Sequence, residues 1–119
     1  MDISFVDMST PASLTPATFH ILLALSEEQR HGLGIADEVE RASEGAISLG
    51  PGTLYRSLKE MTRKGLIIET KGKGGHVDPR RKFYRMTPAG RRALASEARL
   101  LDRIVRVARG RNVLPEETS

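Results

Sequence analysis

Residues 51–65 read PGTLYRSLKEMTRKG, a segment with proline at its front and glycine at its end. Proline favours the first turn of a helix, and glycine favours the position just after the last turn. Between them, Leu54, Leu58 and Met61 fall within about 60° of one another when each residue turns a helix by roughly 100°. The segment therefore predicts an amphipathic helix that packs one apolar face against a core.

The opposite face of this helix is predicted to be cationic. Glu60 is the only acid in the segment, whereas an ordinary exposed face mixes both signs of charge. A cationic face suits a recognition helix in the major groove of DNA, where arginine donates to guanine and hydroxyl groups bond to phosphates or base edges. The alternative is an ordinary amphipathic helix with a solvated polar face. The candidate DNA-binding residues of this segment are Gly52, Thr53, Arg56, Ser57, Lys59 and Arg63.

The segments on either side predict the order helix, helix, helix, β-hairpin, long helix. Thr15-Pro16 and Thr87-Pro88 each combine a capping threonine with a proline in the first helical position. The predicted elements are helices over 15–28, 35–42, 51–64 and 87–109, a turn around 31–34, an extended piece at 46–48, and strands over 66–70 and 81–86. This order predicts a mainly α fold with a small β-hairpin, namely a winged helix-turn-helix followed by a long C-terminal dimerisation helix.

The loop that joins the two predicted strands is basic and rich in glycine. It spans about ten residues, whereas hairpin loops usually have 2–5. We predict a wing that lies along the minor groove or the phosphate backbone and neutralises phosphates without reading sequence. The alternative is a flexible, solvated turn. The candidate phosphate contacts are Lys71, Lys73, Arg80, Arg81 and Lys82, with Arg85 further along the second strand.

The last helix is predicted to join two copies of the chain. Its apolar residues recur with the 3-4 spacing of a seam for another helix, and a hydrophobic share of 39% is low for a self-contained monomer. The candidate dimer-interface residues are Leu94, Ala98, Leu101, Ile104, Val105 and Ala108. A two-fold homodimer would present two recognition helices about 34 Å apart to a near-palindromic operator in double-stranded DNA.

The chain is expected to divide into four parts, within the length of a single domain. They are a flexible N-terminal arm (1–13), a winged helix DNA-binding domain (14–87), the C-terminal dimerisation helix (88–110) and a disordered tail (111–119).

Charge and composition separate the plausible functions. Residues 1–50 hold two basic and eight acidic groups, and residues 51–119 hold 17 basic and seven acidic groups. A segregated basic half is typical of proteins that bind polyanions. The chain has no cysteine, no histidine spacing of a metal site, no phosphate-binding loop and no nucleophile elbow. We therefore expect neither an enzyme nor a bound cofactor or metal.

Nothing in the sequence suggests a membrane segment. No stretch approaches the roughly 20 apolar residues that span a bilayer, and the first residues carry acids where a signal peptide carries positive charge. A cytoplasmic location without membrane contact is expected.

Four motifs together resemble the PadR-like family of transcriptional regulators, over roughly residues 14–108. They are His31-Gly32, Pro51 to Tyr55 with Leu58, Lys64 to Ile67, and Arg81 to Gly90. With one helix after the wing, the chain is similar to the shorter PadR-like subfamily. The resemblance implies a dimeric DNA-binding regulator, usually a repressor, that releases its operator on sensing a small molecule or stress. It also implies that Tyr55 contacts the DNA backbone, for which the alternative is a core tyrosine.

Two positions depart from the family pattern. Leu33 stands where the family often has an aromatic residue, and Arg56 stands where it often has proline. Residues 88–119 contain no aromatic residue, so the dimer helices could grip a planar effector only through aliphatic side chains such as Leu101. We expect weak or no binding of planar drugs there. A second possible function is a winged-helix module for protein contact without operator binding, which predicts exposed apolar residues interrupting the cationic stripe.

Overall fold

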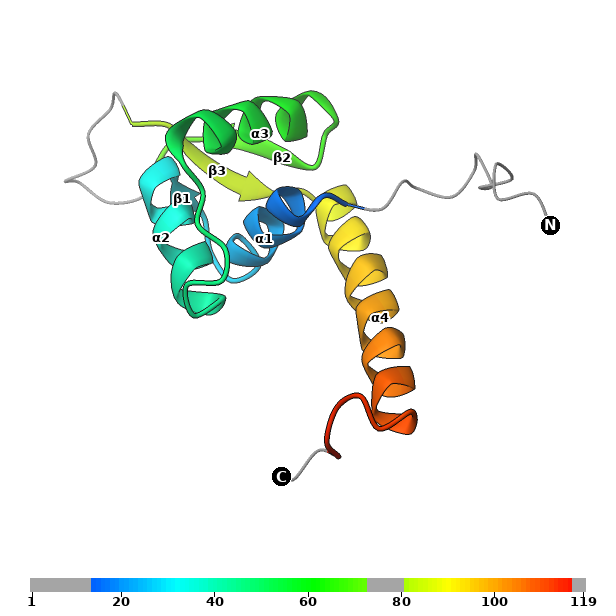
Figure 1. Ribbon diagram of the computed structural model, residues 1–119. Helices are drawn as coiled ribbons and strands as arrows, with labels where there is room; N and C mark the ends of the chain where they lie inside the picture. The colour runs from blue at the N-terminus through cyan, green and yellow to red at the C-terminus, as the bar shows by residue number, and fades with distance from the viewer. Residues whose placement is uncertain (1–13, 73–80, 117–119) are drawn as a thin grey trace.

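The computed structural model describes residues 14–72 and 81–116 of the chain. The elements in chain order are α1 (Pro16–Ala24), β1 (Arg30–His31), α2 (Gly32–Ala42), α3 (Pro51–Arg63), β2 (Ile67–Thr70), β3 (Phe83–Met86) and α4 (Pro88–Gly110). The first three helices and the small sheet form one body, and α4 projects from it as a single long helix (Figure 1). The mainly α fold with a winged helix and a long last helix is confirmed.

The predicted starts of α1, α3 and α4 are confirmed, and each has a local cause. Thr15 and Thr87 are N-caps whose Oγ1 atoms accept hydrogen bonds from the amides of Thr18 and Gly90, at 3.1 and 3.0 Å. The helix α3 begins at Pro51 as predicted. Its chain turns away after Gly65, whose φ of +77° favours glycine.

The sheet differs from the prediction because it has a third strand. The predicted hairpin is present as β2 and β3, with Ile67 opposite Met86. The short strand β1 pairs with the other edge of β3, opposite Tyr84 and Phe83, so the strand order is β1-β3-β2. A strand of two residues is too short to show the alternation of apolar and polar side chains, and its partners lie more than 50 positions away in the sequence. The sequence therefore gives no local signal for β1.

Two local expectations were wrong. The helix α1 ends at Ala24 rather than near Glu28, because the hydroxyl of Ser26 donates to the Leu23 carbonyl at 2.7 Å and the chain tightens there. The predicted turn at 31–34 is the beginning of α2, where His31 serves as the N-cap. The piece at 46–48, which is expected to be extended, leads into α3 without belonging to a helix or strand.

The core lies where the three short helices meet the sheet. Its fully buried side chains come from the three helices and β2: Ile21, Leu22, Ile35, Val39, Leu54, Leu58, Met61 and Ile67. The start of α4 is fastened to this body. The amide of Thr87 donates to the Leu66 carbonyl at 3.1 Å, and Leu94 is only 7% exposed.

The far end of α4 also departs from expectation. Residues 111–116 belong to the predicted disordered tail, but the structure describes them as a turn back along the helix (Figure 1). Asn112 has a φ of +60°, and the amide of Val113 donates to the Ala108 carbonyl at 2.9 Å. This is the hydrogen-bonded C-terminal motif in which asparagine replaces the usual glycine.

Candidate nucleic-acid interface

The helix α3 is oriented as its sequence predicts. Leu54, Leu58 and Met61 are each 1% exposed and hold α3 against the core. Arg56 and Lys59 lie on the exposed side, and neither makes an ion pair with another described residue. The remaining candidates are also accessible: Gly52, Thr53, Tyr55 and Arg63 are exposed, and Ser57 is half-buried.

Arg63 is the one predicted contact of α3 that is already engaged. Its guanidinium lies 2.5 Å from Glu60 Oε1 and 3.0 Å from Oε2, one helical turn earlier. These hydrogen bonds lower the pKa of the Glu60 carboxyl, so Glu60 stays charged, and Lys64 adds a weaker contact at 3.8 Å. The positive charge of Arg63 is therefore partly neutralised within the protein.

The root of the wing stands beside α3. Lys71, Arg81 and Lys82 are exposed, and a groove of about 370 Å³ between α3 and the sheet is lined by Lys59 and Lys82 among others. The helix and the wing root thus contribute cations to the same groove. Lys73 and Arg80 lie outside the described residues.

Not every basic group near the wing faces this groove. Within the groove, Lys82 Nζ lies 3.6 Å from a carboxyl oxygen of Glu69, so the positive charge of Lys82 is partly neutralised. Arg85 lines a separate hollow together with Glu27, Glu28 and Arg91. Because residues alternate sides along a strand, Arg85 is directed away from the buried side that Tyr84 and Met86 share.

Tyr55 joins two of the sequence motifs in space. Its side chain is 50% exposed, so it is not a core tyrosine. Its phenol lies against Gly32 so closely that a Cβ at that position would be 2.8 Å from the tyrosine oxygen. Glycine at the start of α2 therefore leaves room for the Tyr55 ring. As a result, the His31-Gly32 motif and the motif that ends at Tyr55 lie next to each other on one surface.

A hollow of about 390 Å³ opens on this surface, and no motif of the sequence indicates it. It is lined by His31, Gly32, Leu33, Tyr55, Arg81, Lys82 and Tyr84. Pairing of β1 with β3 brings His31 beside Arg81, and only that long-range pairing reveals the site. Leu33 is 58% exposed beside Tyr55, so apolar surface borders the cationic stripe without interrupting it. Burial raises the pKa of the Tyr84 phenol, with a smaller contribution from Glu69.

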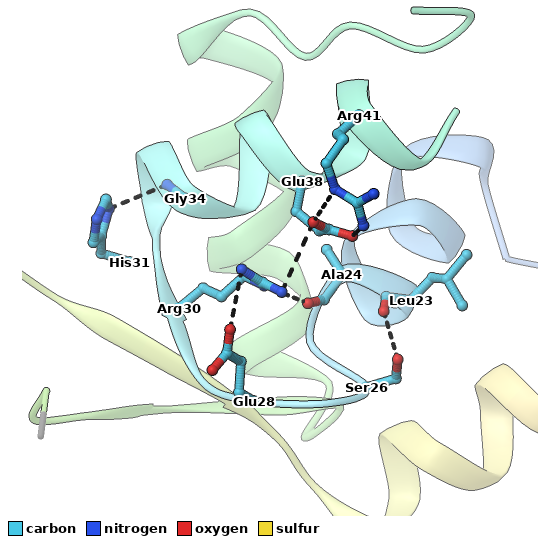
Figure 2. A network of polar contacts seen from close by, with 9 residues as sticks. All are labelled: Leu23, Ala24, Ser26, Glu28, Arg30, His31, Gly34, Glu38 and Arg41. Atoms are coloured by element: carbon cyan, nitrogen blue, oxygen red, sulfur yellow. Dashed lines mark hydrogen bonds and ion pairs between the residues drawn. The ribbon is translucent and has the colours of Figure 1, made fainter. Parts of the chain in front are cut away.

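A polar network holds the loop that presents His31 (Figure 2). From β1, Arg30 donates to the Ala24 carbonyl at the end of α1 at 2.8 Å and lies 3.8 Å from Glu38 on α2. Hydrogen bonds from Arg41 lower the pKa of Glu38 and keep it charged. The network joins α1, β1 and α2, and so fixes where α2 begins.

The candidate dimer residues divide into two groups. Leu94 is buried in the core of its own chain, so it does not lie on the exposed face of α4 with the other candidates. Beyond it, Leu101 and Ile104 are 41% and 53% exposed, Ala98 is exposed, and Val105 and Ala108 are half-buried. Val107 widens this apolar strip.

Other kinds of site find little support in the part of the chain that the structure describes. No group of three acidic or histidine side chains there could hold a metal ion. No helix of that part is both long and apolar enough to cross a bilayer.

Comparison with known proteins agrees with this geometry. The model of the transcriptional regulator PadR-like family matches residues 21–96. The chain is 35% identical over 92 residues to the transcriptional regulator Rv3488 of Mycobacterium tuberculosis. The matched region covers 76% of this chain and 80% of that regulator. A PadR family transcription regulator from Clostridium difficile has a TM-score of 0.67 at 26% identity and covers 79% of this chain and 95% of its own. Bacillus subtilis PadR in complex with operator DNA has a TM-score of 0.57 at 23% identity, over 66% of this chain and 44% of that one.

Proposed function

This chain belongs to the PadR-like family of transcriptional regulators, and we propose that it acts as a homodimeric repressor that binds a near-palindromic operator in double-stranded DNA. The observation that carries the proposal is the exposed cationic face of α3 beside the cationic wing root, over an apolar face that is fully buried. Membership of this family also confirms that the chain is a regulator and not an enzyme.

In the proposed complex, α3 enters the major groove. Arg56 and Lys59 reach base edges and phosphates from its exposed face, and Tyr55 approaches the DNA backbone. Lys71, Arg81 and Lys82 at the wing root neutralise phosphates beside it. Residues 14–87 then form the DNA-binding part, although the first turns of α4 pack with them.

The test begins with selection of duplexes from a random pool at physiological salt, followed by fluorescence anisotropy on the selected site. Arg56→Ala and Lys59→Ala should each weaken binding and reduce the slope of log K against log salt by about 0.9, because each removes one positive charge that would neutralise a phosphate. Arg103→Ala is the matched control. It removes the same charge from an exposed position of α4, about 200° around that helix from Leu101.

The outcome also separates the two candidate functions. Binding that weakens with salt and depends on Arg56 and Lys59 supports the operator-binding regulator. Equal affinity of all three variants for duplex DNA, or no duplex binding by the wild type, would instead favour a winged-helix module for protein contact.

The dimer is proposed to form through α4. Ala98, Leu101, Ile104, Val105 and Ala108 form an apolar strip that the described residues of this chain leave exposed or half-buried. Leu101→Glu with Val105→Glu should give monomers in sedimentation experiments, with much weaker operator affinity, because two like charges per helix would face each other across the seam. Unaltered dimerisation of that variant would exclude this interface.

We infer that a small-molecule or stress signal relieves repression. A hollow of about 270 Å³ at the junction of α1, α3 and α4 supports this inference. It is lined by apolar residues such as Met61 and Leu66 and by the carboxylates Glu60 and Glu97. A small molecule there would push the recognition helix and the dimer helix apart. Ala93→Leu, which fills the hollow from α4, should mimic this and weaken operator binding in the anisotropy assay. Operator affinity equal to that of the wild type in a folded variant would exclude this hollow as the effector site.

A further inference from the structure

The imidazole of His31 faces two hydrogen-bond donors. Its Nδ1 lies 3.1 Å from the backbone amide nitrogen of Gly34 in the first turn of α2 (Figure 2). Its Nε2 lies 3.2 Å from Nη1 of Arg81 at the root of the wing. An edge-on contact with the Phe83 ring, at 5.4 Å between centroids, helps hold the imidazole in this position.

These contacts determine which ring nitrogen carries the hydrogen. A backbone amide and a guanidinium can only donate, and a neutral imidazole has a single acceptor nitrogen. The Gly34 amide is half-buried at a helix start and has no earlier helical carbonyl to bond, whereas Arg81 is exposed to water. The nitrogen Nδ1 is therefore the acceptor, and Nε2 carries the hydrogen.

This assignment leaves two N–H groups close together, and none of the described residues places an acceptor between them. The Nε2–H of His31 and the guanidinium of Arg81 both border the hollow in which Tyr55 and Lys82 also lie. No carboxylate of the described residues lines that hollow, and the nearby Glu69 is paired with Lys82. Converging donors and positive charge without a counter-ion are the chemistry of an oxyanion site.

We propose that this hollow binds a phosphate of the DNA backbone, with His31 Nε2–H and the Arg81 guanidinium donating to its oxygens. The proposal rests on the proposed function and adds His31 to the DNA-binding residues. His31 then has two tasks, because the same ring caps α2 through one nitrogen and binds phosphate through the other. The Arg30 network positions the ring for both.

The first test uses a variant that keeps the cap and removes the donor. In His31→Asn the side-chain oxygen can still accept from the Gly34 amide, because asparagine is a favoured N-cap. The side chain of asparagine is shorter than an imidazole, so its NH2 group does not reach the position that Nε2–H occupies. We expect the melting temperature to stay close to that of the wild type and affinity for the selected duplex to fall about tenfold. The salt slope should not change, because the lost donor is neutral. His20→Asn, which removes an imidazole from α1, is the matched control and should bind as the wild type does.

Arg81→Gln distinguishes a charged contact from the neutral one. It should weaken binding and also reduce the salt slope by about 0.9. If the wild type binds DNA but His31→Asn and Arg81→Gln bind equally well, the phosphate site is wrong and the proposed function stands. If the wild type shows no salt-dependent duplex binding, the proposed function itself fails.

Nitrogen-15 NMR of the imidazole provides a readout that does not depend on affinity. The free protein should show the tautomer with hydrogen on Nε2, and the Nε2 resonance should shift when the selected duplex is added. A predominant Nδ1–H tautomer would overturn the proposal. Inorganic phosphate at the same phosphate concentration should leave the resonance in place. An equal shift with inorganic phosphate would reassign the hollow to a free oxyanion and overturn its assignment to DNA.

Discussion

Replacing Gly90 with alanine tests how α4 is attached to the winged helix. A Cβ at this position would lie 2.1 Å from the carbonyl oxygen of Leu66 and 3.0 Å from Cγ of Met86. Real Cβ contacts are essentially never shorter than 3.0 Å, and the nearest atom belongs to the backbone. The first turn of α4 and the start of β2 would therefore have to separate by about 0.9 Å in Gly90→Ala.

That separation would break the bonds that fasten α4. The Thr87 amide donates to the Leu66 carbonyl at 3.1 Å, and the Thr87 hydroxyl reaches the Gly65 and Leu66 carbonyls at 2.7 and 3.0 Å. Overpacking usually lowers the free energy of unfolding by about 1–3 kcal/mol, and each lost hydrogen bond lowers it by about 1 kcal/mol. The higher helix propensity of alanine raises the free energy of unfolding by up to about 1 kcal/mol. With these three bonds lost, the amounts sum to a net loss of about 3–5 kcal/mol, which corresponds to a melting temperature roughly 12–20 °C lower for a chain of 119 residues.

Thermal and urea unfolding followed by circular dichroism, at one protein concentration, would measure the effect. Gly52→Ala is the matched control, since Gly52 also lies in a first helical turn but a Cβ there meets nothing within 4 Å. Propensity alone predicts that both variants gain stability, whereas the packing predicts opposite signs. A Gly90→Ala protein as stable as the wild type, or more so, would refute the close contact between α4 and Leu66.

Two further predictions concern ionisable groups. Glu60→Gln should release Arg63 for DNA, so affinity for the operator should rise and the salt slope should steepen by up to about 0.9 in the anisotropy assay. An affinity equal to that of the wild type would show that Arg63 does not reach the duplex. Burial raises the pKa of Tyr84 in the folded protein, so the unfolded chain releases this proton first and stability should fall as pH rises past about 10. Urea unfolding between about pH 8 and 11 would show this loss in the wild type, and a loss of equal size in Tyr84→Phe would contradict it.

The sequence alone was sufficient wherever a local pattern decides the structure. The helix from Pro51 to Gly65, its apolar face and its exposed cations follow from the spacing of residues within four turns. The two Thr-Pro starts follow from caps that need only the next three residues. The ion pair between Glu60 and Arg63 also had a sequence signal, because residues three apart are neighbours on a helix.

Tertiary structure decided the features that depend on distant partners. The strand β1 exists because Arg30 and His31 pair with Tyr84 and Phe83. Two residues are too few to show the alternation of apolar and polar side chains that would predict a strand. The same pairing brings His31 beside Arg81 and creates the hollow between α2, α3 and the wing. Leu94 has the spacing of the α4 seam but is buried in the core of its own chain, since helical periodicity identifies an apolar face without specifying which surface covers it.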